Sequence, residues 1–291
     1  MRSIVVPVAD RPECAEALTT AFSIADRLNA NVHGFHIRPH RREEKQKARP
    51  SLDFSRGLIG LGDFFDELTE KQVELNSKAA ARLFRSLCEA HGFESKKRVG
   101  LNQVGGQAIW RELVGSPQRQ FAIVGPLADM IVVSRPKKST SKRARAFLLA
   151  ALMQSARPVL VLPQRKAKTV GRSILVAWNQ SVEAAAMVNA AVPMLQTADA
   201  VHIVSAGKQD GSGPKSTAVA DYLRGWGVKA TTTQTRGRHD RDELLKVYDD
   251  KNCDLMVMGA YSRARWRETV FGGLTEHVLF KAKLPVLMMH R

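Results

Sequence analysis

Two glycine-containing segments near the end of the sequence have the residue types of a phosphate-binding site. Gly259 ends an apolar run, and nine residues separate Ser262 from Gly272 and Gly273, which open a helix-like stretch. A glycine at a strand end lets the backbone approach a ligand closely, and glycines at a helix start leave N–H groups free where the helix dipole favours an anion. Three arginines that can bond phosphate oxygens lie between: Arg263, Arg265 and Arg267. The alternative is a plain loop whose glycines serve turn and cap geometry.

The elements around these residues are those of an open parallel sheet. In the second half of the chain, short apolar runs rich in Val and Ile alternate with stretches of helical periodicity. Continuous apolar runs are typical of strands covered on both faces, and the alternation predicts an α/β fold whose ligands bind at the carboxyl ends of the strands. The expected strands are 173–178, 200–205, 228–233, 254–258 and 285–289, and the expected helices are 182–196, 215–226, 240–251 and 272–283.

The first half of the chain echoes the second. Three pairs of segments correspond in the same order: 4–8 with 174–178, 129–134 with 254–259, and 157–162 with 284–289. A repeat of this kind predicts a tandem duplication, with two open parallel five-stranded sheets and helices on both faces. The predicted domains are 1–165 and 170–291. The first contains an insertion at about 38–70, which we expect to be a long surface loop with some helix.

At these positions the sequence resembles the universal stress protein family, in particular its tandem two-domain bacterial members. In the family signature, glycines stand at the places of Gly259, Ser262 and Gly272, and a Ser or Thr stands at that of Gly273. The first and third glycines match, whereas Ser262 and Gly273 depart from the pattern. The resemblance spans both halves outside the insertion, and it implies a fold like that of the adenine nucleotide alpha hydrolases.

The resemblance implies a stress-response protein of binding or regulatory function, with ATP or another adenine nucleotide bound in the second domain. In nucleotide-binding members an Asp after the first strand contacts the adenosine portion; here Asn179 stands there, which still hydrogen-bonds but carries no charge. Mg²⁺ is expected only with a bound triphosphate. The residues carried over are Ala177, Asn179, Ala206, Met258 and Gly259 for the adenosine portion, and Ser262, Gly272, Gly273 and Leu274 for the phosphates.

The first half departs further from the signature. Ala9 stands at the place of the acid and Ser134 at that of the strand-four glycine, while Arg145 and Ala146 replace the paired glycines. Side chains at these places crowd a phosphate path, so we expect this degenerate half to be mainly structural. In the family, domains pair through their last strands, which implies an internal pairing of the two halves here, in a monomer or a homodimer.

Two other motifs compete with this interpretation. The run 211–217 follows a strand and opens a helix, but Pro214 stands before Lys215 where a P-loop needs glycine. The basic run 135–145 in the first half fits a solvated loop, or a contact to nucleic acid or polyphosphate. No aromatic residue that could stack on a base interrupts its basic residues.

The 291 residues carry 45 Lys and Arg against 28 Asp and Glu, a formal net charge of +17. With 44% hydrophobic residues the chain can form real cores, which excludes a disordered chain. No apolar run approaches the roughly 20 residues of a membrane span, and three separated cysteines fit neither a disulfide framework nor a zinc site. We therefore expect a cytoplasmic protein with no membrane contact and no metal site.

Three functional hypotheses follow from the sequence. The first is the nucleotide-binding regulatory protein, which is not an enzyme, has no catalytic residues and hydrolyses ATP at most slowly and incidentally. The alternative is a nucleotide-free scaffold for an unknown protein partner, and it is favoured by the departures at Asn179, Ser262 and Gly273. The third is binding of nucleic acid through the basic run of the first half.

Overall fold

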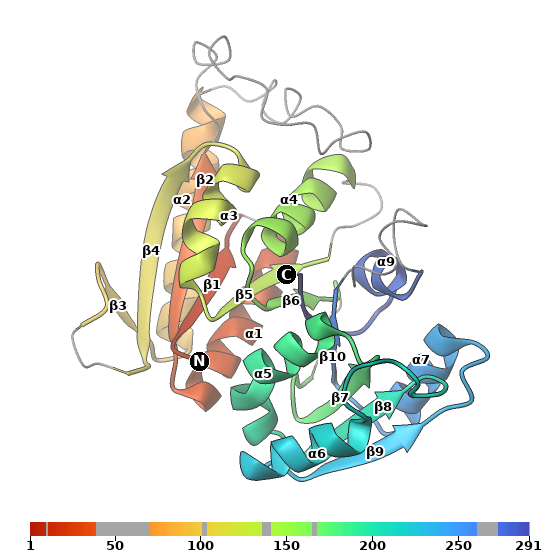
Figure 1. Cartoon of the computed structure of the whole chain (residues 1–291). Helices are drawn as coiled ribbons and strands as arrows, with labels where there is room; N and C mark the ends of the chain where they lie inside the picture. The colour runs from red at the N-terminus through yellow and green to blue at the C-terminus, as the bar shows by residue number, and fades with distance from the viewer. Residues whose placement is uncertain are drawn as a thin grey trace.

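The computed structural model describes residues 1–9, 11–38, 70–100, 104–135, 141–164, 168–260 and 273–290. Helices cover both faces of one long sheet, and the two halves of the chain lie at opposite ends of that sheet (Figure 1). The insertion expected at about 38–70 falls outside the described residues except at its two ends.

The elements of the second half match the expected ones closely. Four of their strands are apolar and largely buried, as expected for strands covered on both faces, whereas β9 at the edge of the sheet is polar and mostly exposed. The Ser181 hydroxyl caps the first helix of this half by accepting the N–H of Ala184 at 3.1 Å. The elements are β7 (Ser173–Trp178), α5 (Val182–Gln196), β8 (Ala200–Ser205), α6 (Ser216–Gly225), β9 (Ala230–Gln234), α7 (Asp240–Asp250), β10 (Leu255–Gly259), α9 (Gly273–Phe280) and β11 (Val286–Met289).

The first half contains the corresponding elements and one additional strand. That strand, β3, is short, exposed and charged, so no apolar pattern announces it. The elements are β1 (Ser3–Pro7), α1 (Pro12–Leu28), β2 (Asn31–Arg38), α2 (Glu70–Ala90), β3 (Glu94–Lys96), β4 (Gln107–Val114), α3 (Pro117–Val124), the 3-10 helix η3 (Gly125–Leu127), β5 (Met130–Ser134), α4 (Ser141–Gln154) and β6 (Val159–Leu162).

The strands form one sheet in the order β3-β4-β2-β1-β5-β6-β11-β10-β7-β8-β9. Neighbours are parallel within each half, and only the two last strands, β6 and β11, are antiparallel, with Leu160 opposite Leu287. The α/β class is therefore confirmed, but a split into two five-stranded sheets is not. The reason is that the apolar last strands pair with each other, which satisfies the backbone groups that each would otherwise expose at a sheet edge.

Two apolar clusters cover the two faces of the sheet, and each runs through both halves of the chain. One includes Ile4 of β1 and Val176 of β7, which are packed under α1, α2, α5 and α6. The other includes Ile131 of β5 and Met256 of β10, under α3, α4, α7 and α9. Both halves thus contribute to the core that supports the carboxyl ends of the second-half strands.

Candidate functional site

The carboxyl ends of β7, β8 and β10 meet at one edge of the sheet. Ala177 lies opposite Met258 on one side and Val204 on the other. Trp178 lies opposite Ser205, so the residues that follow these two leave the sheet at the same edge. The structure therefore brings together the residues expected for an adenosine portion, Ala177, Asn179, Ala206, Met258 and Gly259.

Gly259 has a packing reason of its own. A Cβ atom at this position would lie 2.6 Å from the backbone nitrogen of Ala184 and 2.9 Å from Cβ of Glu183, both in the first turn of α5. These distances are too short for any side chain. The glycine that the sequence motif assigns to ligand approach is thus required by the close contact of β10 with α5.

Asn179 follows β7, and its side chain is exposed. One hydrogen bond fixes which way its amide group is turned. Its Oδ1 accepts the backbone N–H of Ser181 at 3.2 Å. Because a backbone N–H can only donate, the oxygen faces Ser181 and the amide nitrogen faces the other way. An aspartate would keep this bond with one oxygen and offer a second acceptor. Asn179 offers a donor at that atom.

The glycine-rich run 211–217 is folded onto the end of β7. The indole nitrogen of Trp178 donates to the carbonyl of Pro214 at 2.9 Å. At the start of α6, the backbone N–H of Ser216 donates to the side-chain oxygen of Gln209 at 2.6 Å. A donor that a P-loop would turn toward phosphate therefore has a partner in the chain, which disfavours the P-loop interpretation.

The expected phosphate end of the site coincides with the start of α9. Gly273 and Leu274 are its first residues, and Leu274 packs against the apolar cluster that contains Ala177 and Met258. The first N–H groups of a helix have no partner within the helix, so they can bind an anion. Ser262 and Gly272 lie outside the described residues.

An arginine of the first half holds the opposite end of α9. Arg135, directly after β5, is only 5% exposed. Its guanidinium donates to the carbonyl oxygens of Leu279 at 2.9 Å, Val278 at 2.8 Å and Leu284 at 3.0 Å. Burial lowers the pKa of Arg135 to about 10, because the charged form loses hydration.

The basic run of the first half therefore begins at the contact between the two halves. The sequence predicts a solvated loop, or a contact to nucleic acid or polyphosphate, for 135–145; at its start, however, Arg135 is buried between the halves. Farther along, the guanidinium of Arg145 lies 4.0 Å from the centre of the Phe280 ring at the end of α9. The sequence shows a basic run, but nothing in it signals these partners because they lie more than a hundred positions away.

In the first half, Ser134 occupies the place that Gly259 has in the second. Its hydroxyl donates to the carbonyl of Glu13 in the first turn of α1 at 2.5 Å. The last residues of β5 and β10 thus both contact the first helix of their own half. Ser134 makes the contact through its hydroxyl, and Gly259 through its backbone.

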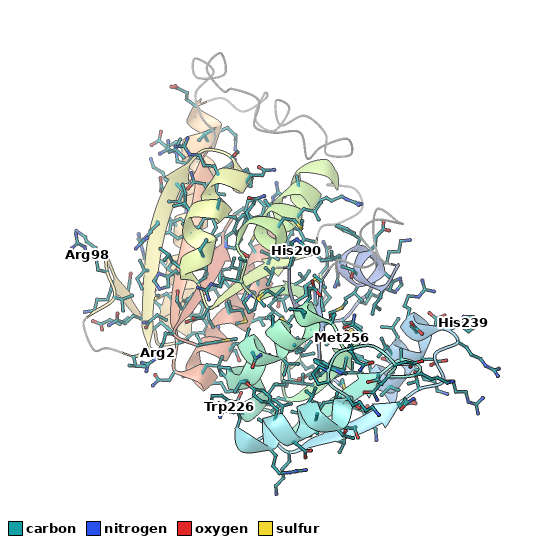
Figure 2. The ribbon with its side chains drawn as sticks, in the orientation of Figure 1. Arg2, Arg98, Trp226, His239, Met256 and His290 are labelled. Carbon is teal, nitrogen blue, oxygen red and sulfur yellow. The ribbon has the colours of Figure 1, made fainter. Side chains whose placement is uncertain are left out.

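The loop between β9 and α7 leaves the sheet at the same edge as the candidate site. The N–H of Thr235 at its start donates to the carbonyl of Ser205 at 2.9 Å. The nearby Thr235 hydroxyl, together with hydrogen bonds from the backbone N–H groups of Gly237 and Arg238, lowers the pKa of Glu243 to about 2. The loop ends at His239, at the outer end of the molecule (Figure 2).

Two features are absent from the described part of the chain. Within these ranges, no group of three or more His, Cys, Asp or Glu side chains is placed to hold a metal ion. No helix among the same residues has the length and apolar character needed to cross a membrane.

Comparison with known proteins identifies the second half. Residues 171–290 match the model of the universal stress protein family. A universal stress protein from Synechocystis sp. is 26% identical over 279 residues, covering 91% of this chain and 91% of the relative. The expected resemblance to this family is confirmed.

Solved structures show the same fold over nearly the whole chain. A universal stress protein from Archaeoglobus fulgidus superposes with a TM-score of 0.70 at 13% identity, covering 99% of this chain and 96% of the other. A protein from Pseudomonas aeruginosa described as a putative universal stress protein has a TM-score of 0.58 at 17% identity, covering 99% and 93%. These likenesses establish the fold of both halves.

Proposed function

Residues 171–290 form a universal stress protein domain, and on this premise we propose that the domain binds ATP or another adenine nucleotide. The protein acts in a stress response by binding or regulation, and any hydrolysis of ATP is slow and incidental. In this proposal the units are 1–165 and 170–291, and the first is mainly structural.

The observation that carries the proposal is that three strand ends lie together and that the helix with the expected phosphate residues packs on the same apolar cluster. Ala177 and Met258 are paired on β7 and β10, and Leu274 of α9 packs against the cluster that contains them. The same part of the fold thus combines an apolar cluster with N–H groups that have no partner within their own helix. An adenine nucleotide has the matching halves, since its base is flat and largely apolar and its phosphates are anionic.

The donors at this edge fit the two parts of such a ligand. The amide of Asn179 can bond the adenosine portion, and the N–H groups at Gly273 and Leu274 can bond phosphate oxygens with support from the helix dipole. Ala206, Met258 and Gly259 complete the proposed adenosine end, and Ser262 and Gly272 the phosphate end. Mg²⁺ would come with a triphosphate, whose oxygens it prefers as ligands.

Isothermal titration calorimetry with ATP, ADP and AMP tests the proposal. We expect saturable binding to the wild-type protein. Gly273→Glu should abolish the preference for phosphorylated ligands, because it places a negative charge at the phosphate end, while glutamate in a first helical turn is compatible with folding. No heat and no thermal shift with millimolar nucleotide would remove the proposal.

Gly225→Glu is the matched control. A Cβ at Gly225, the last residue of α6, meets no atom within 4 Å, so the same substitution is accommodated there. We expect this variant to bind nucleotide as the wild type does. If both variants lose binding equally, the phosphate end has been placed wrongly.

A nucleotide-free scaffold for an unknown protein partner is the second candidate. The contact between Gly259 and the first turn of α5 favours it, since this glycine is needed for packing without any ligand. Mass spectrometry of small molecules released by heating the purified protein separates the two candidates. Adenine nucleotide in that fraction would eliminate the scaffold without ligand.

A further inference from the structure

The most unusual buried group in the described chain is the guanidinium of Arg135. It belongs to the first half, yet every hydrogen bond that its side chain makes among the described residues goes to a carbonyl oxygen of the second half. Its Nη1 nitrogen is buried and has no hydrogen-bond partner within the ranges that the structure describes. Burying a charged guanidinium among neutral carbonyls costs free energy, because the charge loses its hydration and gains no opposite charge.

The three carbonyls lie where α9 ends and the chain turns toward β11. Val278 and Leu279 belong to the last turn of α9, and Leu284 precedes β11. The last carbonyls of a helix have no partner within the helix, and a cation there complements the negative end of the dipole. Arg135 therefore acts as the C-terminal cap of α9, so a residue of the first half caps a helix of the second half.

α9 has eight residues, from Gly273 to Phe280. A helix this short moves as a rigid piece, so a group that holds its last turn also sets the direction of its first. The adenosine end of the site lies instead on β7, β8 and β10, which are positioned by strand pairing. The two ends of the proposed site thus have different supports.

We propose that Arg135 is a positioning residue for the phosphate end of the site, acting through α9 without touching the ligand. The first half of the chain thereby sets how well the second half binds phosphate. This inference rests on the proposed nucleotide-binding function. It assigns to the first half a role in ligand recognition although that half has lost the glycines of its own motif.

The test compares ATP with adenosine, which lacks the phosphates, on full-length protein by calorimetry. In Arg135→Met, a variant of similar side-chain length, we expect ATP to bind about tenfold more weakly, roughly 1.4 kcal/mol, and adenosine to bind within about twofold of wild type. Arg135→Lys keeps the positive charge and should recover part of the affinity for ATP. A purely structural role would change both ligands together.

Arg157→Met is the matched control. Arg157 also donates its guanidinium to a carbonyl, that of Pro126 at 2.8 Å, but within the first half. We expect unchanged binding of both ligands. If Arg135→Met does not fold, as judged by circular dichroism, the comparison of Arg135→Lys with Arg157→Lys decides.

The failures are distinguishable. Wild-type protein that binds neither ligand removes the proposed function together with this inference. Wild-type protein that binds ATP, with an ATP-to-adenosine ratio unchanged in the folded Arg135 variants, overturns the positioning role alone.

Discussion

Asp129 and Asp254 make the same contact in the two halves of the molecule. The carboxylate of Asp129 accepts the backbone N–H groups of Arg2 and Ser3 at the start of β1. That of Asp254 accepts those of Gly171, Arg172 and Ser173 at the start of β7. Asp129 precedes β5 and Asp254 precedes β10, and each carboxylate links its strand to the first strand of the same half, at the edge opposite the candidate site.

Removing this tie should destabilise the protein. Asp254→Ala leaves three N–H groups at the start of β7 without their charged acceptor, and we expect a loss of about 2 kcal/mol in the free energy of unfolding. Urea denaturation followed by circular dichroism measures it. Asp221→Ala, which removes an exposed carboxylate paired with Arg224 on α6, should change stability by less than about 0.5 kcal/mol. Equal losses in the two variants would contradict the tie.

The orientation of the Asn179 amide predicts how the substitution Asn179→Asp changes the affinity for adenosine. In Asn179→Asp one oxygen keeps the bond to Ser181 while the other becomes a charged acceptor. We expect adenosine to bind about tenfold more tightly, by about 1.5 kcal/mol, because its donor groups gain a charged partner. Calorimetry with adenosine measures the change.

The control for this variant is the same substitution on the outer surface of α5. Asn189 accepts a hydrogen bond from the Tyr222 hydroxyl, and Asn189→Asp should leave adenosine binding unaltered. An affinity that does not rise in Asn179→Asp would remove Asn179 from the site.

Glu243 predicts a pH dependence of stability. Its pKa is lowered from 4.5 to about 2, so the folded state prefers the ionised form. The stabilisation is fully present above about pH 4.5 and is lost as the pH falls toward 2. In Glu243→Gln this pH-dependent part is absent. We expect the difference in melting temperature between wild type and Glu243→Gln to shrink between pH 4.5 and 2, and a difference that stays constant would contradict the assignment.

Gly259→Ala should destabilise the protein even without any ligand. The added methyl would lie 2.6 Å from the backbone of α5, and relief of such a contact requires backbone shifts that cost about 1–3 kcal/mol. Gly225→Ala is the control, because that position has open space and alanine favours a helix by up to about 1 kcal/mol. Thermal melts of both variants in nucleotide-free buffer measure the contrast, which is absent if Gly259 serves only a ligand.

The sequence predicts the buried parallel strands well because a strand covered on both faces appears in it as a continuous apolar run. β10 and β11 are continuous apolar runs, and every residue of β11 is buried. The edge strands carry a weaker mark. β3 consists of the exposed residues Glu94, Ser95 and Lys96, so its position follows from pairing with β4 and not from hydrophobic pattern.

The contacts at the candidate site could be predicted only in part. Spacing places Asn179 and Gly259 at strand ends, since a strand end follows from local pattern. It does not reveal that Gly259 packs on α5 or that Arg135 reaches α9, because these contacts join segments distant in sequence. The pairing of β6 with β11 is implied by the family resemblance alone, and its antiparallel register, with Leu160 opposite Leu287, is seen only in the structure.

The antiparallel join of β6 and β11 also limits how copies of this chain can associate. The last strands of the two halves pair with each other within the molecule, so among the described strands only β3 and β9 lie at the outer edges of the sheet, where a strand of another copy could pair. If the second half binds nucleotide as proposed, each molecule therefore has one such site and one unit that departs from the motif, whatever the concentration of the protein.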